Sequence, residues 1–151
     1  MGPTQEALDP VRFISNHSSG KMGLALAKAF KGRGAEVYVV SGPVSLDILS
    51  EGFHFFPIHS ASEMYAAAKS IHEQMDICVF AAAVADYAPA VVATEKIKKQ
   101  GEELTIQLRK NVDIAFELET TMSQRGKDMG VLEATRATPG TSTSSRRRRS
   151  T

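Results

Sequence analysis

The sequence predicts an α/β fold with a Rossmann-like, doubly wound, mostly parallel sheet that is incomplete. Apolar residues at helical spacing alternate along the chain with short β-branched runs. A continuous apolar run at residues 77–83 has the character of a parallel strand covered on both faces. A chain of 151 residues without internal repeats fits one domain. In one domain, this alternation is typical of helices packed on both sides of a single sheet.

The first half of the chain predicts a helix followed by a strand. The helix covers residues 21–30, and Gly32 and Gly34 end it. The run at 36–40 is β-branched and is followed by Ser, Gly and Pro at 41–43, so it predicts a strand that enters a tight turn. The buried face of the helix consists of Met22, Ala25, Leu26, Ala29 and Phe30.

A second series of strand, helix and strand follows. The apolar run at 53–58 predicts a strand, and Ser60 with Glu63 three residues later predicts a capping box at a helix start. The helix leads directly into the predicted strand at 77–83. Its buried face consists of Met64, Ala67, Ala68, Ile71 and Met75.

The last part of the chain is less regular. Residues 95–99 are rich in lysine and predict an exposed loop, whereas the alternation at 104–109 predicts a strand with one wet face. Residues 111–118 predict a helix capped by Asn111. We expect residues 119–151 to form a divergent, disordered tail, because its final stretch has few apolar groups to bury.

Composition excludes several classes of function. The chain carries 18 Lys and Arg against 17 Asp and Glu, so no broadly basic nucleic-acid surface is expected. Its single cysteine, Cys78, excludes an intramolecular disulfide. No run approaches the length of a membrane span and no signal segment is visible, so a cytoplasmic protein without membrane contact is expected. The histidines show no metal-ligand spacing, and we expect no protein-held metal.

A candidate phosphate site lies directly before the first helix. Unpaired backbone N–H groups and the helix dipole favour an anion there. Two hydroxyls, a glycine and a lysine strengthen this prediction. The residues are Ser18, Ser19, Gly20 and Lys21. The alternative is that Ser18 or Ser19 simply caps the helix.

Two further features are candidate ligand contacts. Asp86 follows the most buried predicted strand, at the edge where open α/β sheets bind ligands, although it could equally be a turn residue after an alanine-rich strand. Lys96, Lys98 and Lys99 place three cations on four residues, as a polyphosphate requires. A solvated basic loop is the alternative for these lysines.

Four motifs occur in order along the chain: GPTQEALDPVRFISNHSSGKMGLALA at 2–27, VSGPVSL at 40–46, AAAVADY at 81–87 and EKIKK at 95–99. Together they resemble phosphopantothenoylcysteine synthetase, most closely its bacterial form, which is commonly the second half of a bifunctional synthetase/decarboxylase. The resemblance spans residues 2 to about 118 and implies a partial nucleotide- and phosphopantothenate-binding synthetase domain at 1–118. It implies that the domain is truncated at both ends, without the apolar first strand that the family carries before Gly2.

The resemblance also implies roles for the matching residues. Arg12 and Asn16 match positions that hold phosphopantothenate and its activated acyl group, and Lys96 opens a mobile flap over the triphosphate. These three are the expected catalytic residues. The positions that match nucleotide contacts are Phe80, Ala81, Ala82, Asp86, Lys96, Val112, Asp113, Ile114 and Ala115, with Val112 standing where the family usually has proline.

The activity implied by the resemblance is ligation of cysteine to 4'-phosphopantothenate in coenzyme A biosynthesis. CTP is the co-substrate, Mg²⁺ is carried by the nucleotide, an acyl-cytidylate is the intermediate, and the family forms homodimers. A phosphate- or nucleotide-binding module without catalysis is the alternative. A third reading assigns a nucleic-acid or import role to Arg146, Arg147, Arg148 and Arg149, although no nucleic-acid partner is expected from the composition.

Overall fold

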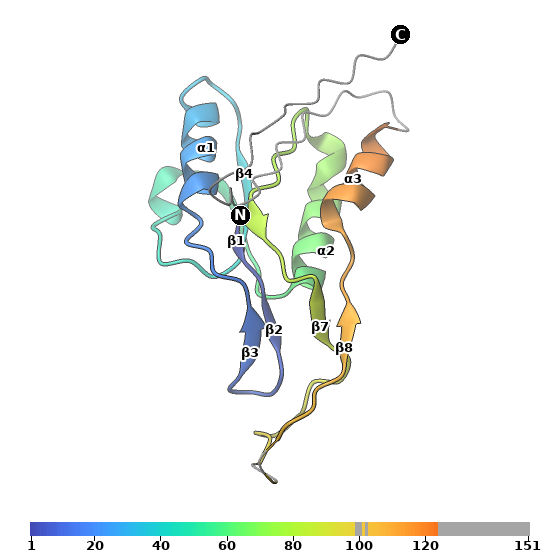
Figure 1. Cartoon of the computed structure of the whole chain (residues 1–151). Helices are drawn as coiled ribbons and strands as arrows, with labels where there is room; N and C mark the ends of the chain where they lie inside the picture. The colour runs from blue at the N-terminus through green and yellow to red at the C-terminus, as the bar shows by residue number, and fades with distance from the viewer. Residues whose placement is uncertain (99–100, 102, 124–151) are drawn as a thin grey trace, which may run out of the picture.

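A parallel sheet lies at the centre of the computed structural model, which describes residues 1–98, 101 and 103–123 (Figure 1). Strand β1 (Gly2–Pro3) pairs in parallel with β6 (Ala82–Ala83), and β4 (Tyr38–Ser41) pairs in parallel with β5 (His54–Pro57). Met1 joins the two pairs, since its amine donates to the Val40 carbonyl and its carbonyl accepts from the Gly42 N–H at 3.0 Å. The two parallel pairs remain two-stranded, and with the Met1 link between them they confirm the α/β class with an incomplete parallel sheet.

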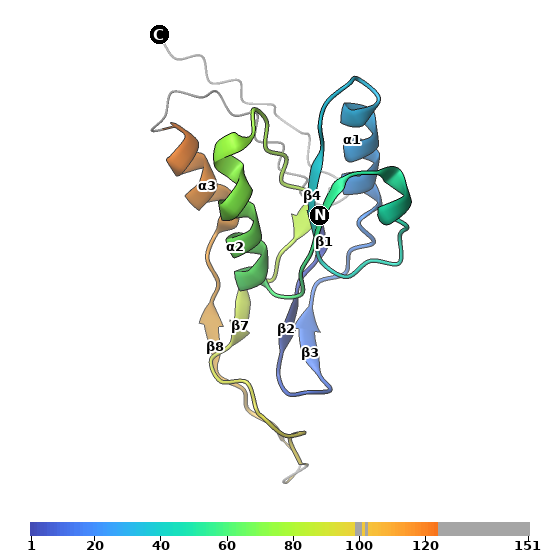
Figure 2. The same ribbon diagram turned by 180° about the vertical axis from the view of Figure 1, so that it is seen from behind.

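Helices cover the sheet on both sides (Figures 1 and 2). Helix α1 (Lys21–Lys31) packs through the buried cluster of Ala27, Val39 and Ile48. Helices α2 (Ala61–Ile71) and α3 (Ile114–Ser123) lie on the other side. Their buried cluster consists of Ile58, Met64, Ile114 and Leu118. These two clusters on opposite faces are what a doubly wound arrangement requires.

Two antiparallel ribbons extend from the helical part of the molecule (Figure 1). One consists of β2 (Gln5–Ala7) and β3 (Phe13–Ser15), and the other of β7 (Tyr87–Pro89) and β8 (Leu108–Lys110). Strands β2, β3 and β7 were not predicted from the sequence, because strands of three residues are too short to show a period of two. The strand expected at 104–109 is paired only from Leu108 onward.

Helix α2 begins as its sequence predicts. The Ser60 hydroxyl accepts a hydrogen bond from the Glu63 N–H at 3.2 Å, which confirms the cap, and the Glu63 carboxylate accepts from the His59 N–H at 2.7 Å. The sequence did not reveal that Glu6 also takes part. Its carboxylate, on a residue only 4% exposed, accepts from the Ala61 N–H at 2.8 Å and so satisfies a further donor of the first turn.

The boundaries of other elements differ from expectation. Only Ala82 and Ala83 of the predicted strand 77–83 have a ladder partner, because no strand lies beside 77–81 within the described residues. Asp113, rather than Asn111, caps α3, since its carboxylate accepts from the Phe116 N–H at 3.1 Å. Short 3₁₀ turns occur at Leu49–Glu51 and His72–Gln74.

The end of the chain lies mostly outside the described residues. Helix α3 runs on to Ser123, past the expected boundary at 118. The expected tail from residue 124 onward, with Arg146 to Arg149, and the flap residue Lys99 are not described. Among the described helices, none has both the length and the apolar character needed to cross a membrane.

Candidate functional site

Three segments distant in sequence meet where β6 ends. Asn16, directly after β3, donates its side-chain amide to the Val84 carbonyl at 3.0 Å. Asn111, directly after β8, donates its side-chain amide to the Ala85 carbonyl at 2.8 Å and its N–H to the Asp86 carbonyl at 2.8 Å. The backbone at 84–86 therefore ties together the ends of β3, β6 and β8. This edge is the carboxyl end of the parallel strands, where open α/β sheets bind ligands.

Thr4 positions these segments relative to one another. Thr4 is fully buried, at 0% exposed, and its hydroxyl accepts from the Ala85 N–H at 3.0 Å. Its carbonyl accepts from the Ser15 hydroxyl at 2.7 Å, and its N–H donates to the Ala83 carbonyl at 3.4 Å. Thr4 thus fixes the end of β3, and with it Asn16, against the end of β6. Thr4 was not predicted as a site residue, because nothing in the sequence around it marks a buried hydroxyl.

The start of α1 leaves backbone donors available. Gly20 is the N-cap, with φ 71°, and no side chain caps the helix. The Ser18 and Ser19 hydroxyls accept from the Gly20 and Lys21 N–H groups only at 3.4 and 3.5 Å, beyond the usual range of about 2.7–3.2 Å. Capping by serine, the alternative to an anion site, is therefore weak here. A Cβ on Gly20 would lie 2.8 Å from Val44 Cγ1, so this turn requires glycine.

Arg12 lies at the other end of β3 from Asn16, about 13 Å away for four residues of extended chain. It makes a bidentate pair with Asp9, with Nε at 2.9 Å and Nη2 at 2.6 Å from the same carboxylate oxygen. Its Nη2 also donates to the Ile97 carbonyl at 2.9 Å. The predicted catalytic residues Arg12 and Asn16 are therefore not side by side within this chain.

Asp9 is the anchor of this second region. Its carboxylate accepts from the backbone N–H groups of Val11 and Arg12, each at 2.8 Å, and of Ile97 at 3.0 Å. The hydrogen bonds from the Arg12 guanidinium, followed by those from the backbone, hold the pKa of Asp9 well below its ordinary value. Asp9 thereby fastens the segment that carries Lys96, which is exposed, to the tip of the β2–β3 ribbon.

Some of the residues predicted to contact a nucleotide lie at the edge of the sheet, and others lie in the core. Ile114 is buried, and Phe80 and Ala82 pack against the cluster to which it belongs. Asp86, Val112 and Asp113 are exposed, while Ala81 and Ala115 are half-buried. Within the described residues, no group of three His, Cys, Asp or Glu side chains is placed to hold a metal ion.

This arrangement is that of an incomplete Rossmann-like α/β domain with its candidate site at the carboxyl edge of the sheet. The chain belongs to the family described as the DNA/pantothenate metabolism flavoprotein C-terminal domain, whose model matches residues 1–138. The family assignment inferred from the four motifs is thereby confirmed.

Relatives with curated descriptions are about half identical over the matched part. The coenzyme A biosynthesis bifunctional protein CoaBC of Escherichia coli K12 is 55% identical over 116 residues, which cover 75% of this chain and 28% of that protein. The protein of the same name from Bacillus subtilis is 49% identical over 117 residues, covering 78% of this chain and 29% of the relative. The chain thus spans less than a third of these two relatives.

Solved structures share the fold. The C-terminal domain of a CoaBC protein superposes with a TM-score of 0.67 and 36% identity, covering 86% of this chain and 58% of that domain. The DNA/pantothenate metabolism flavoprotein from Streptococcus pneumoniae gives the same TM-score, 0.67, at 20% identity, which speaks to the fold alone.

Proposed function

We propose that this chain carries the substrate-binding part of a phosphopantothenate–cysteine ligase that uses CTP. The observation that carries the proposal is the hydrogen bond from Asn16 to the Val84 carbonyl, 3.0 Å long. This bond sets the turn before α1 beside the strand end that bears Asp86. If a phosphorylated acid binds at the turn and a nucleotide binds at the strand end, their reacting atoms face each other.

The proposed reaction has two steps. A carboxylate oxygen of 4'-phosphopantothenate attacks the α-phosphorus of CTP, and the bond from that phosphorus to the leaving pyrophosphate breaks. The amine of cysteine then attacks the acyl carbon and displaces CMP. Neither step needs a nucleophile from the protein, so catalysis rests on positioning and on stabilising charge.

Each candidate residue takes a part that suits its chemistry. The free N–H groups at the start of α1, with Ser18, Ser19, Gly20 and Lys21, bind the substrate phosphate. Asn16 orients the activated acyl group. The segments 80–82 and 112–115 border the nucleotide together with Asp86. Mg²⁺ enters with the triphosphate and neutralises part of its charge.

In this proposal, Lys96 does not reach the nucleotide from the position that it has within one protomer. Asp9 holds its segment at the ribbon tip, beside Arg12 and away from Asn16. Lys96 therefore reaches a triphosphate either when this segment moves or when a second protomer supplies it. We propose a cytoplasmic homodimer in which Arg12 and Lys96 serve the partner's site.

A pyrophosphate-release assay tests the proposed activity. With Mg²⁺, CTP and 4'-phosphopantothenate, the protein should release pyrophosphate, and CMP release should require cysteine. Asn16→Ala and Lys96→Met should each lower the rate by at least tenfold, because each removes a group that acts on the reacting atoms. Lys69→Met is the matched control and should retain the rate, since it removes an exposed lysine in the last turn of α2 that has no part in the proposed site.

Mixing the two inactive variants tests the shared site. If protomers exchange Lys96, a mixture of Asn16→Ala and Lys96→Met regains activity, up to about a quarter of the wild-type rate for random pairing. Binding of CTP by calorimetry without pyrophosphate release would instead support a binding module, and absence of both would refute the ligase proposal.

A further inference from the structure

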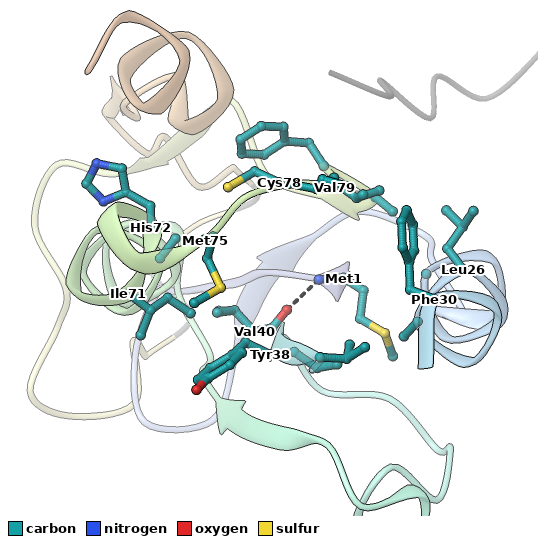
Figure 3. Close-up of a pocket in the computed structure, with 18 of the residues that line it drawn as sticks. Met1, Leu26, Phe30, Tyr38, Val40, Ile71, His72, Met75, Cys78 and Val79 are labelled. Atoms are coloured by element: carbon teal, nitrogen blue, oxygen red, sulfur yellow. Dashed lines mark hydrogen bonds between the residues drawn. The ribbon is translucent and has the colours of Figure 1, made fainter. Parts of the chain in front are cut away.

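The turn between β2 and β3 holds a segment of the chain that follows β7 (Figure 1). The Ala93 N–H donates to the Leu8 carbonyl at 2.9 Å, and the Ile97 N–H donates to the Asp9 carboxylate at 3.0 Å. The Ile97 carbonyl accepts from Nη2 of Arg12 at 2.9 Å, so one pair of side chains binds both backbone groups of this residue. None of these residues lines the cavity of about 670 Å³ beside α1, α2 and β4 (Figure 3), so this contact is a separate feature of the molecule.

Asp9 is a buried carboxylate with a full set of hydrogen bonds. Its side chain is 0% exposed. Oδ1 accepts from the N–H groups of Val11 and Arg12, each at 2.8 Å, within the turn itself. Oδ2 accepts from Nε and Nη2 of Arg12, at 2.9 and 2.6 Å, and from the Ile97 N–H. Because burying a carboxylate is costly unless its charge is paired and its oxygens are bonded, this set of partners fixes the orientation of both Arg12 and Ile97.

Arg12 keeps two of its five side-chain N–H donors free. Nε and Nη2 supply the other three, two to Asp9 and one to the Ile97 carbonyl. Within the part of the chain that the structure describes, Nη1 has no hydrogen-bond partner, and the Arg12 side chain is 39% exposed. A carboxylate or phosphate oxygen can therefore bind Nη1 while the three other bonds remain in place. Asp9 thus presents the guanidinium to an acidic ligand in a fixed orientation.

We infer that Asp9 is a positioning residue of the proposed ligase, because it joins Arg12 and the segment that carries Lys96 into one unit. The inference rests on the proposed function, in which both residues serve the site of the partner protomer. An acidic substrate that binds Nη1 of Arg12 then meets a Lys96 segment that is already held at Ile97 from both sides. Without Asp9, Arg12 and this segment each lose conformational freedom separately on binding, which weakens catalysis by both residues.

Amide hydrogen exchange in the full chain, without substrates, tests the unit itself. The variant is Asp9→Asn, whose remaining side-chain oxygen still accepts from the N–H groups of the turn, whereas its NH₂ group cannot accept from Arg12 or Ile97. Exchange of the Ile97 N–H and of the Arg12 Nε–H should both become faster by about tenfold or more. The Ala90 N–H, which bonds to the Gln107 carbonyl at 2.9 Å, should change little and shows that the second ribbon is intact. Unchanged exchange at Ile97, or a change at Ile97 but not at Arg12, would overturn the inference.

Mixtures of variants test whether this unit acts in the partner's site. Asp9→Asn alone should lower the rate of pyrophosphate release by about tenfold or more, whereas Asp76→Asn, which removes an exposed carboxylate outside the proposed site, should retain it. Mixed with Asn16→Ala, the Asp9→Asn protein should regain activity, because a mixed dimer has one site with an intact Asn16 and an intact unit from the other protomer. Mixed with Lys96→Met, it should stay inactive, because neither protomer supplies an intact unit.

These outcomes separate positioning from a defect in folding. A merely structural defect in Asp9→Asn would also damage the site of its own protomer, so the mixture with Asn16→Ala would stay inactive and overturn the inference. Recovery of activity with Lys96→Met would overturn it too, because Asp9 and Lys96 would then serve different sites. Absence of pyrophosphate release by the wild-type protein would refute the ligase proposal, whereas the exchange measurement still decides whether Asp9 joins Arg12 to the Lys96 segment.

Discussion

At the scale of single residues, the site depends on polar side chains that are buried away from solvent. Thr4 and Asp9 contact no proposed substrate, yet each fixes a segment that does. Thr4 bonds to Ala85 at 3.0 Å and to Ser15 at 2.7 Å. Asp9 bonds to Ile97 at 3.0 Å. Neither residue could be chosen from the sequence, because the bonds to Ala85 and Ile97 join residues that are 81 and 88 positions apart.

Replacing Thr4 with valine should destabilise the protein and loosen the site. Valine has nearly the same shape but leaves the buried Ala85 N–H without its acceptor, which costs about 1–3 kcal/mol of unfolding free energy. Urea unfolding measures this loss. Thr4→Ser keeps the hydroxyl and is the control; an equal loss in both variants would mean that packing, and not the hydrogen bond, is what matters.

Asp9→Asn should weaken the anchor of the Lys96 segment in a pH-dependent way. The pKa of Asp9 is lower in the folded than in the unfolded state, so the folded state binds fewer protons and the carboxylate stabilises it. That contribution is complete above about pH 4, the ordinary value, and is lost as pH falls below it. The stability difference between wild type and variant should shrink from pH 7 toward pH 2. A difference that does not vary with pH would contradict this role.

At the scale of elements, helices were predictable and the ribbons were not. The helix expected at 21–30 is observed at Lys21–Lys31, and the Ser60 cap of α2 is observed as well. Each follows from interactions within a few residues. The paired strands are two to four residues long and owe their pairing to distant partners, such as Gly2 with Ala82. Such pairing leaves little trace in local sequence.

Gly42 follows β4 directly and lies against the backbone of Pro3 in β1, so a side chain at position 42 should destabilise the protein. A Cβ there would lie 1.6 Å from the Pro3 carbonyl oxygen, a contact that only backbone movement can relieve. Gly42→Ala should therefore cost on the order of 3 kcal/mol of unfolding free energy.

Gly34→Ala is the comparison for that variant. Gly34 has φ 88° but no atom within 4 Å of the added Cβ, so only backbone strain of about 1–2 kcal/mol applies. Thermal unfolding of both variants measures the difference. Equal losses of unfolding free energy in the two variants would show that the contact with Pro3 does not set the requirement for glycine at position 42.

At the scale of the whole molecule, Met1 links the two parallel pairs of strands, because its carbonyl accepts from the Gly42 N–H at 3.0 Å.

The overall architecture was predictable from the alternation of helices and strands, and the family from four ordered motifs. The placement of the candidate site residues in the structure was not predictable. Asn16 and Asp86 come together at one edge because Thr4 and Asn111 link the strand ends. Arg12, although it is on the same motif as Asn16, lies at the ribbon tip beside the segment that carries Lys96. Proximity in sequence gave no information on this separation, since β3 carries the chain between Arg12 and Asn16.

Amide chemical shifts measured during titration with CTP, Mg²⁺ and 4'-phosphopantothenate test the central claim most directly. Phosphopantothenate should shift the N–H signals of residues 18–22, and CTP should shift those of 81–86 and 113–115, with both sets mapping to one edge of the sheet. Shifts scattered over separate faces, or no shift at either segment, would contradict a shared site at the carboxyl ends of β1 and β6.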